Sequence, residues 1–152
     1  MVKRIIVISF VILITASALS LSFAQRRSLH NKRNFIKRNT VVFTIFKEIE
    51  NSFSKSDIGK IARKLSGQTY LNLMDKINGY YSSNQAYYVL KEFFENYHIV
   101  RFKFQNIVTD NNNPYATGKY IYVHRRKQDI ARVYIAIKLV GHFWKITQIT
   151  IN

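Results

Sequence analysis

The segment IARVYIAIKLVGHFWKITQITI, residues 130–151, decides the fold. In its first half, apolar side chains occupy every second position: Val133, Ile135, Ile137 and Leu139. This alternation predicts a strand with one buried face. Gly141-His142 is a turn signal, and residues 143–151 are expected to form the returning strand. The segment is therefore interpreted as a β-hairpin.

Two further strands are expected before this hairpin, at residues 99–109 and 115–124. The first has apolar residues on one predicted face: Val100, Phe102, Phe104 and Val108. Its other predicted face is polar: Arg101, Lys103 and Gln105. A turn is expected at residues 110–114 and a charged loop at residues 125–129. The chain after residue 98 thus predicts an antiparallel meander.

Helices are expected on the N-terminal side of the meander, at residues 40–54, 57–65 and 82–97. Thr40 is the expected N-cap of the first helix. Ser82 and Gln85 have the spacing of a capping box at the start of the third. Residues 68–77 are interpreted as a strand and Asn78-Gly79 as a turn. Helices gathered before a sheet predict an α+β domain, with a curved antiparallel sheet packed on the helices.

The N-terminus has the pattern of a secretory signal. Lys3 and Arg4 precede an apolar run at residues 5–18, and Leu21-Ser22-Phe23-Ala24 has small residues where a cut after Ala24 requires them. Residues 1–24 are therefore expected to be a signal peptide, and the protein to be exported to the periplasm or cell envelope. The alternative is an uncleaved membrane anchor, because the apolar run is almost long enough to span a bilayer.

Residues 25–39 are rich in charge and have little apolar surface to bury, so they are expected to be a flexible basic arm before the domain at residues 40–152. The cations of this arm are Arg26, Arg27, Lys32, Arg33, Lys37 and Arg38. Next to an anionic membrane, each would contribute about 1 kcal/mol. Cations directly after an apolar segment also resist translocation, which fits the anchor alternative.

The charge of the whole chain points to anionic partners. Its 152 residues include 24 Lys and Arg against 8 Asp and Glu, a formal net charge of +16. The candidate partners are an anionic membrane surface, a glycolipid or a protein, and export makes nucleic acid less expected. Lysine as a general solubilising residue is the competing interpretation. The absence of cysteine excludes disulfides and thiolate metal sites.

A basic surface on the sheet is the candidate binding site. Its residues are Arg101, Lys103, Tyr120, Tyr122, Arg132, Tyr134 and Lys138. If these side chains share the outer face, cations would hold phosphates and tyrosine rings would stack on sugars or bases. The competing interpretation is that the cations prevent edge pairing and the tyrosines reflect β-propensity. A homodimer through the sheet face is a third interpretation.

The stretch GYYSSNQA at residues 79–86, followed by VLKEFF at 89–94, resembles the helix motif of the domain of unknown function 4783 family. Later pieces agree with this resemblance: Tyr115-Ala116-Thr117-Gly118, Arg132-Val133-Tyr134, Lys138-Leu139-Val140 and residues 144–151. The resemblance covers residues 40–152 and implies an exported bacterial protein with a nuclear transport factor 2-like, or cystatin-like, fold. Members often have a His and a Gly where this chain has Gln105-Asn106-Ile107.

The family has no established activity, so the resemblance implies no catalytic residues. It does imply a cone-like cavity, in which related enzymes place an Asp or His and a Tyr for acid–base chemistry. The candidates here are Asp75, His98, His124, His142, Tyr120 and Tyr122. None pairs convincingly with another, and the acids and histidines lack metal-ligand spacing. We therefore expect a non-enzymatic binding module without a cofactor. A small-ligand carrier or acid–base enzyme is the alternative.

Overall fold

The structure is a computed structural model that describes residues 32–74, 76–109 and 112–152. The chain divides into two compact units, Met1–Arg38 and Asn39–Asn152. In the first unit, residues 32–38 are helical. Within the described ranges, no helix combines the length and the apolar character that crossing a membrane requires. The expected signal peptide, its cleavage site, Arg26 and Arg27 lie outside the described residues.

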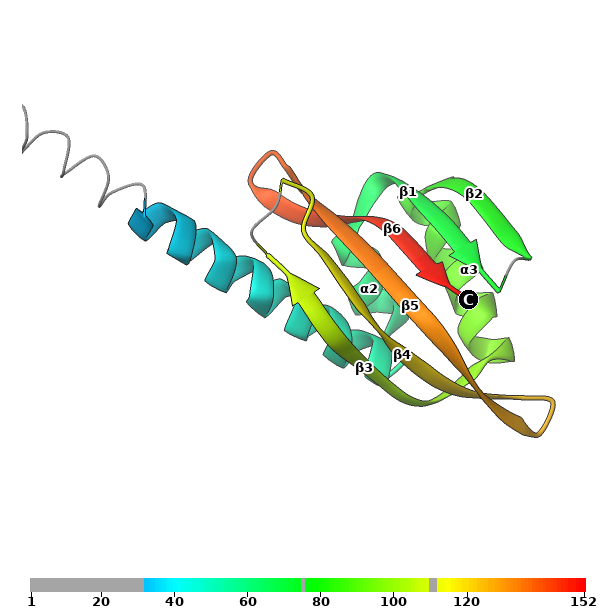
Figure 1. Cartoon of the computed structure of the whole chain (residues 1–152). Coiled ribbons are helices and arrows are strands. Elements are labelled where there is room, and N and C mark those ends of the chain that lie inside the picture. The colour runs from blue at the N-terminus through cyan, green and yellow to red at the C-terminus, as the bar shows by residue number, and fades with distance from the viewer. Residues whose placement is uncertain (1–31, 75, 110–111) are drawn as a thin grey trace, which may run out of the picture. The chain divides into compact units, whose positions relative to one another are not determined.

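In the second unit, the described residues form a six-stranded sheet with the order β2-β1-β6-β5-β4-β3 (Figure 1). The strands are β1 Leu65–Leu73, β2 Ile77–Ser82, β3 His98–Val108, β4 Tyr115–His124, β5 Lys127–Val140 and β6 Phe143–Ile151. The pairing of β1 with β6 is parallel, and the other four pairings are antiparallel. The meander from β3 to β6 confirms the expected strands, except that β5 begins at Lys127, within the loop expected at residues 125–129.

The helices of this unit are residues 39–54, α2 Ile58–Lys64 and α3 Ser83–Asn96. They lie on one side of the sheet (Figure 1). Each contributes fully buried side chains to the common core, such as Phe53, Ile61 and Leu90. The α+β class, with helices packed on a curved sheet, is confirmed; the sheet is antiparallel as expected except for the parallel pairing of β1 with β6.

The start of α3 confirms the expected capping box. The Ser82 hydroxyl accepts a hydrogen bond from the Gln85 amide at 3.3 Å, and the Gln85 Oε1 accepts one from the Ser82 amide at 3.0 Å. Two otherwise unpaired backbone donors are satisfied in this way, which is why the helix begins at this point.

The predicted turn at Asn78-Gly79 is wrong. Both residues lie within β2, where Asn78 pairs with Asn72 and Gly79 with Leu71. The chain instead reverses between Leu73 and Ile77. The ladder with β1 continues to Ser82, so pairing along the whole strand outweighs the local turn preference of two residues.

The first helix does not begin at Thr40. Residues 39–54 are all helical, and the Thr44 hydroxyl donates to the Thr40 carbonyl at 3.0 Å. Residues 32–38 are helical as well, whereas a flexible arm was expected there. Lysine and arginine are good helix formers, so this basic segment has a helical preference although its apolar residues, Phe35 and Ile36, are exposed. Lys32, Arg33, Lys37 and Arg38 are exposed.

Two bulges in β3 change its predicted faces. The pairing of β3 with β4 shifts between Ile99 and Arg101, and again between Phe104 and Asn106. Between the shifts, Phe102 and Phe104 are buried as expected, whereas Val100 is 55% exposed. An extra residue on one strand interrupts the strict alternation of side chains, so a face predicted over the whole strand does not hold.

Candidate anion-binding surface

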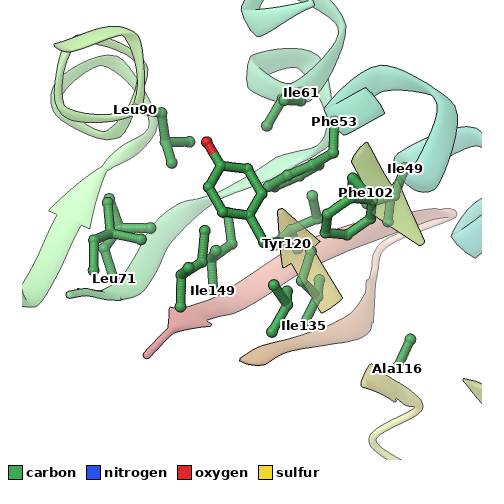
Figure 2. Packing of buried hydrophobic residues seen from close by; sticks show 14 of the residues in the cluster. Ile49, Phe53, Ile61, Leu71, Leu90, Phe102, Ala116, Tyr120, Ile135 and Ile149 are labelled. Atoms are coloured by element: carbon green, nitrogen blue, oxygen red, sulfur yellow. The ribbon is translucent and has the colours of Figure 1, made fainter. Parts of the chain in front are cut away.

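Aromatic and aliphatic side chains fill the space between the helices and the sheet. Tyr120 lies at its centre with no exposed surface, next to Phe53 and Phe102 (Figure 2). The rings of Phe53 and Phe102 stack at 5.0 Å, and Phe93 and Phe94 lie within 6.2 Å of the Tyr120 ring. In the described part of the chain, the position expected for a ligand inside the cone is therefore occupied by the protein itself.

Tyr120 and Tyr122 do not belong to the outer surface, and their assignment to it was wrong. Both point to the core side of β4, where Tyr120 is fully buried and Tyr122 is 9% exposed. The Tyr120 hydroxyl donates a hydrogen bond to the Tyr97 carbonyl. Burial raises the pKa of Tyr120 well above its ordinary range, and burial together with Asp129 raises that of Tyr122. Both phenols are thus neutral at physiological pH.

The histidine candidates are dispersed. His98 and His142 are exposed, while His124 stacks on Tyr97 at 4.5 Å and contacts the Asn96 carbonyl through Nδ1 at 2.8 Å. The structure thus joins His124 to the tyrosines through Tyr97, a residue that the sequence pattern did not single out. Asp75 lies outside the described residues. Among the described residues, no group of three His, Cys, Asp or Glu side chains is arranged to hold a metal.

The cations of the predicted surface are exposed: Arg101, Lys103, Arg132 and Lys138. None of these side chains makes an ion pair with any residue that the structure describes. On β3, Arg101 and Lys103 flank the buried Phe102 and so point away from the core. On β5, Arg132 likewise lies between buried residues and faces outward. These positions confirm the outer placement of the predicted cations.

Lys119 joins this surface and was missed by the sequence analysis. It pairs directly with Lys103 on one side and with Arg132 on the other. We call Lys103, Lys119 and Arg132 the cation row, since the three residues stand side by side on three neighbouring strands. Cα atoms of directly opposite residues are about 5 Å apart. A groove of 460 Å³ lies at the β3 and β4 members of this row, lined by Arg101, Lys103, Phe104, Gln105, Lys119 and Ile121.

A tyrosine pair lies beside the cation row. Tyr134 is two residues from Arg132 on β5, and its ring stacks on that of Tyr115 at 5.4 Å. Both rings are half-buried. Tyr134 was part of the predicted surface, and its ring does lie beside the cations. Tyr115 was not predicted there, whereas the predicted Tyr120 and Tyr122 are buried.

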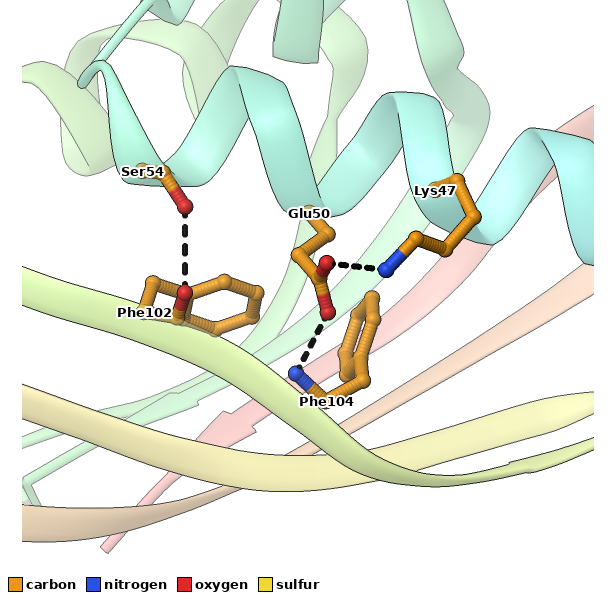
Figure 3. A network of polar contacts seen from close by, with 5 residues as sticks. All are labelled: Lys47, Glu50, Ser54, Phe102 and Phe104. Atoms are coloured by element: carbon orange, nitrogen blue, oxygen red, sulfur yellow. Dashed lines mark hydrogen bonds and ion pairs between the residues drawn. The ribbon is translucent and has the colours of Figure 1, made fainter.

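Two polar contacts position β3 under the first helix (Figure 3). Oε2 of Glu50 accepts a hydrogen bond from the Phe104 amide at 2.7 Å, and the Ser54 hydroxyl donates to the Phe102 carbonyl at 3.1 Å. On the other side of β3, Gly118 allows β4 to come close, because a Cβ there would lie 2.3 Å from the Lys103 carbonyl oxygen. These contacts hold the strand that carries Arg101 and Lys103.

Residues 46–152 match the model of a family described as a domain of unknown function, DUF4783. The chain belongs to the DUF4783 family. No curated protein is similar enough to this sequence to count as a relative.

Solved structures place the DUF4783 domain in a known fold. A DUF4783 family protein from Bacteroides uniformis is 16% identical, with a TM-score of 0.63 over 70% of this chain and 94% of that one. A second, from Bacteroides ovatus, is 15% identical, with a TM-score of 0.60 over 68% and 90%. A nuclear transport factor 2-like protein of unknown function from Shewanella oneidensis is 11% identical, with a TM-score of 0.52 over 72% and 94%. These likenesses confirm the nuclear transport factor 2-like fold.

Positive charge is in greater excess on the sheet of this DUF4783 domain than on its helices. Asp129 is the only acidic residue in the six described strands. The same strands hold the cations Arg101, Lys103, Lys119, Lys127, Arg132, Lys138 and Lys145. Among the described acids, Glu48, Glu50, Glu92 and Glu95 lie on helices. The sheet is therefore the strongly positive side of the DUF4783 domain.

Proposed function

We propose that this protein is a non-enzymatic binding module of the cell envelope, and that its outer sheet face holds a glycolipid with phosphate groups. The signal-like pattern of residues 1–24 supports the location. The charge of the sheet supports an anionic partner, and the stacked Tyr115 and Tyr134 beside it offer a surface for a sugar ring.

The cation row is the observation that carries this proposal. Like charges placed directly opposite each other destabilise a sheet, and Lys103, Lys119 and Arg132 are opposite in register without an acidic neighbour on their strands' outer faces. A bound phosphate group would reverse this repulsion into attraction, as cations grouped at one place do for multivalent anions. Free protein thus keeps an unfavourable arrangement that an anionic ligand relieves.

The filled interior also favours a binding module over a ligand carrier or an acid–base enzyme. A ligand carrier or acid–base enzyme of this fold would use the cone, which Tyr120 and its neighbours occupy (Figure 2). The Tyr120 hydroxyl is also already engaged with the Tyr97 carbonyl. A symmetric homodimer through the sheet face would bring the cation rows of the two copies close together. The repulsion between these like charges opposes the homodimer interpretation.

Binding to a phosphorylated disaccharide glycolipid in phosphatidylcholine vesicles tests the proposal. The variant Lys103→Gln/Lys119→Gln/Arg132→Gln should bind about tenfold or more weakly, with a smaller dependence of affinity on salt. The control Lys55→Gln/Lys91→Gln/Lys127→Gln loses the same formal charge away from the cation row. It should keep most of the affinity.

Three outcomes would contradict the proposal. Equal losses in the two triple variants would mean that total charge, and not the cation row, determines binding. Equal binding of the dephosphorylated glycolipid would remove the role of phosphate. Equal binding of vesicles with phosphatidylglycerol in place of the glycolipid would show that membrane charge suffices and that the sugar is not recognised.

A further inference from the structure

The hairpin between β5 and β6 ends in exposed apolar side chains. We call residues 139–144 the hairpin tip. Leu139 is 50% exposed, Val140 49% and Phe143 70%. Val140 pairs with Phe143, and Leu139 pairs with Trp144. Successive pairs point to opposite faces, so both faces of the tip are apolar. Trp144 is half-buried, because it also packs against the core. Leu139 was expected to continue the buried row of β5, and its exposure is a correction. Large apolar side chains gathered at a protruding end mark a contact surface.

Cations surround the base of the hairpin tip. Lys138 and Lys145 pair directly behind it. A surface groove of 620 Å³ extends from Phe143 and Trp144 towards Lys60, Arg63 and Lys64. Asp57 pairs with Lys60, and Glu48 pairs with Lys64. Among the described residues, no ion pair neutralises Arg63, Lys138 or Lys145.

The hairpin is also held against the body of the domain. The Lys145 ammonium donates a hydrogen bond to the Arg63 carbonyl at 2.7 Å, near the C-terminal end of α2. Ile146, the next residue, is 1% exposed and pairs with Leu65. The tip therefore projects from a fixed base, which keeps its apolar residues ahead of the cations.

We infer that the hairpin tip enters the interface of a bilayer that contains anionic lipids. Phe143, Leu139 and Val140 would lie among the acyl chains near the headgroups, where apolar side chains gain burial. Trp144 would sit at headgroup level, the place that tryptophan prefers. Lys138 and Lys145 would reach the lipid phosphates from behind. The inference uses other residues than the cation row and does not depend on the glycolipid proposal.

Charge favours a bilayer over a second copy of the chain. A symmetric contact places the same patch of both copies face to face. Arg63, Lys138 and Lys145 would then approach the same cations of the partner, while the nearby acids Asp57 and Glu48 are already paired with Lys60 and Lys64. An anionic bilayer offers an apolar layer and negative headgroups at once, in the order in which the tip presents its residues.

Trp144 is the only tryptophan of the chain, so its fluorescence reports on the hairpin tip directly. The full protein is mixed with vesicles of phosphatidylcholine and phosphatidylglycerol. Trp144 emission should shift to shorter wavelength, become less accessible to acrylamide, and be quenched by lipids brominated near the headgroup end of the chains. Vesicles of phosphatidylcholine alone should produce a much smaller shift.

The variant Leu139→Ser/Phe143→Ser should lose these changes. Val100→Ser/Ile130→Ser is the matched control, because these residues are 55% and 57% exposed on strands away from the tip. Circular dichroism and the thermal midpoint establish that both variants fold. The cation-row triple variant should keep the quenching by brominated lipid, which separates this inference from the proposed function.

The inference is overturned by any of four results. If Trp144 emission shifted as much with neutral vesicles as with anionic ones, the cations would have no role in binding. A shift without quenching by brominated lipid would mean contact with headgroups only. A shift that appears without lipid as the protein concentration rises would assign the tip to self-association. Loss of quenching in the Val100→Ser/Ile130→Ser control would show that the tip is not the inserting element.

Discussion

The Glu50 carboxylate accepts a hydrogen bond from the backbone amide of Phe104, with 2.7 Å between Oε2 and N. The amide belongs to the part of β3 where the pairing with β4 shifts. Glu50 also pairs with Lys47 through its other oxygen (Figure 3). One side chain on the first helix thus satisfies a donor next to a sheet irregularity and fixes the strand that carries Lys103.

Removing this carboxylate should destabilise the domain. Glu50→Ala leaves the Phe104 amide without its acceptor, and we expect a loss of about 1–3 kcal/mol in the free energy of unfolding. Glu50→Gln keeps an acceptor oxygen and should lose less. Urea unfolding measures both. Glu48→Ala removes an exposed ion pair with Lys64 and should cost about 0–1 kcal/mol. Equal losses at positions 48 and 50 would contradict the role of the Phe104 contact.

Gly118 should not tolerate a side chain. A Cβ there would lie 2.3 Å from the Lys103 carbonyl oxygen and 2.9 Å from the Phe104 Cα, both backbone atoms that cannot rotate away. We expect Gly118→Ala to cost about 3 kcal/mol or more. Gly67→Ala is the control, because no atom lies within 4 Å of its Cβ position. Thermal unfolding compares the two, and similar midpoints would refute the close approach of β3 and β4.

The capping box at Ser82 should contribute measurably to stability. Ser82→Ala removes the acceptor of the Gln85 amide, for an expected loss of about 1 kcal/mol. The neighbouring Ser83 is exposed and is the first residue of α3. Ser83→Ala should therefore change the free energy of unfolding very little. A larger loss at position 83 than at 82 would contradict the capping assignment.

Stability should fall at alkaline pH because of Tyr120. Its pKa is raised by burial, whereas a tyrosine in the unfolded chain ionises near pH 10, as model peptides do. Above about pH 10 the unfolded chain loses a proton that folded Tyr120 keeps, so the free energy of unfolding decreases as pH rises.

The variant Tyr120→Phe isolates this effect. It should cost about 1 kcal/mol at pH 7, through the lost hydrogen bond to Tyr97, and its stability should decline less between pH 8 and pH 11. The two proteins differ only at position 120, so the difference between their slopes reports on Tyr120. Tyr80→Phe, at a position that is 70% exposed, should keep the wild-type slope. Identical slopes for all three proteins would mean that Tyr120 ionises freely.

Charge reversal within the cation row should stabilise the free protein. Lys119→Glu places an acid directly opposite Lys103 and Arg132, and we expect a gain of about 0.2–1 kcal/mol per opposite pair. The gain should shrink in high salt, since exposed charges are screened. Lys55→Glu changes the net charge equally outside the row. If it stabilises the protein as much as Lys119→Glu, the register of the cations has no special effect.

Local patterns were sufficient for much of this fold. Ser82 and Gln85 interact across three residues, so the start of α3 could be predicted from neighbours in the sequence. The strand from Tyr115 to His124 and the returning strand from Phe143 to Ile151 were predicted at their observed limits. The limits of these strands could be predicted because turn residues and the alternation of apolar residues are local patterns, which do not depend on contacts between distant residues.

The candidate site could be predicted only in part. Alternation around the buried Phe102 correctly placed Arg101 and Lys103 on one outer face. On β4 the same argument fails, because large apolar or aromatic residues occupy both faces: Tyr120 and Tyr122 on one, Ile121 and Val123 on the other. Periodicity alone does not say which of these faces the helices cover, so the two buried tyrosines were assigned to the surface.

By itself the sequence determined the helices, the meander of strands and the excess of positive charge, since each of these depends on composition or on contacts between near neighbours. Only the tertiary structure decided that β2 continues through Asn78-Gly79, that Tyr120 fills the core, and that Lys103, Lys119 and Arg132 stand in one row. These features depend on the register between paired strands and on which face of the sheet the helices cover. A shift of one residue in that register turns every side chain of a strand to the opposite face.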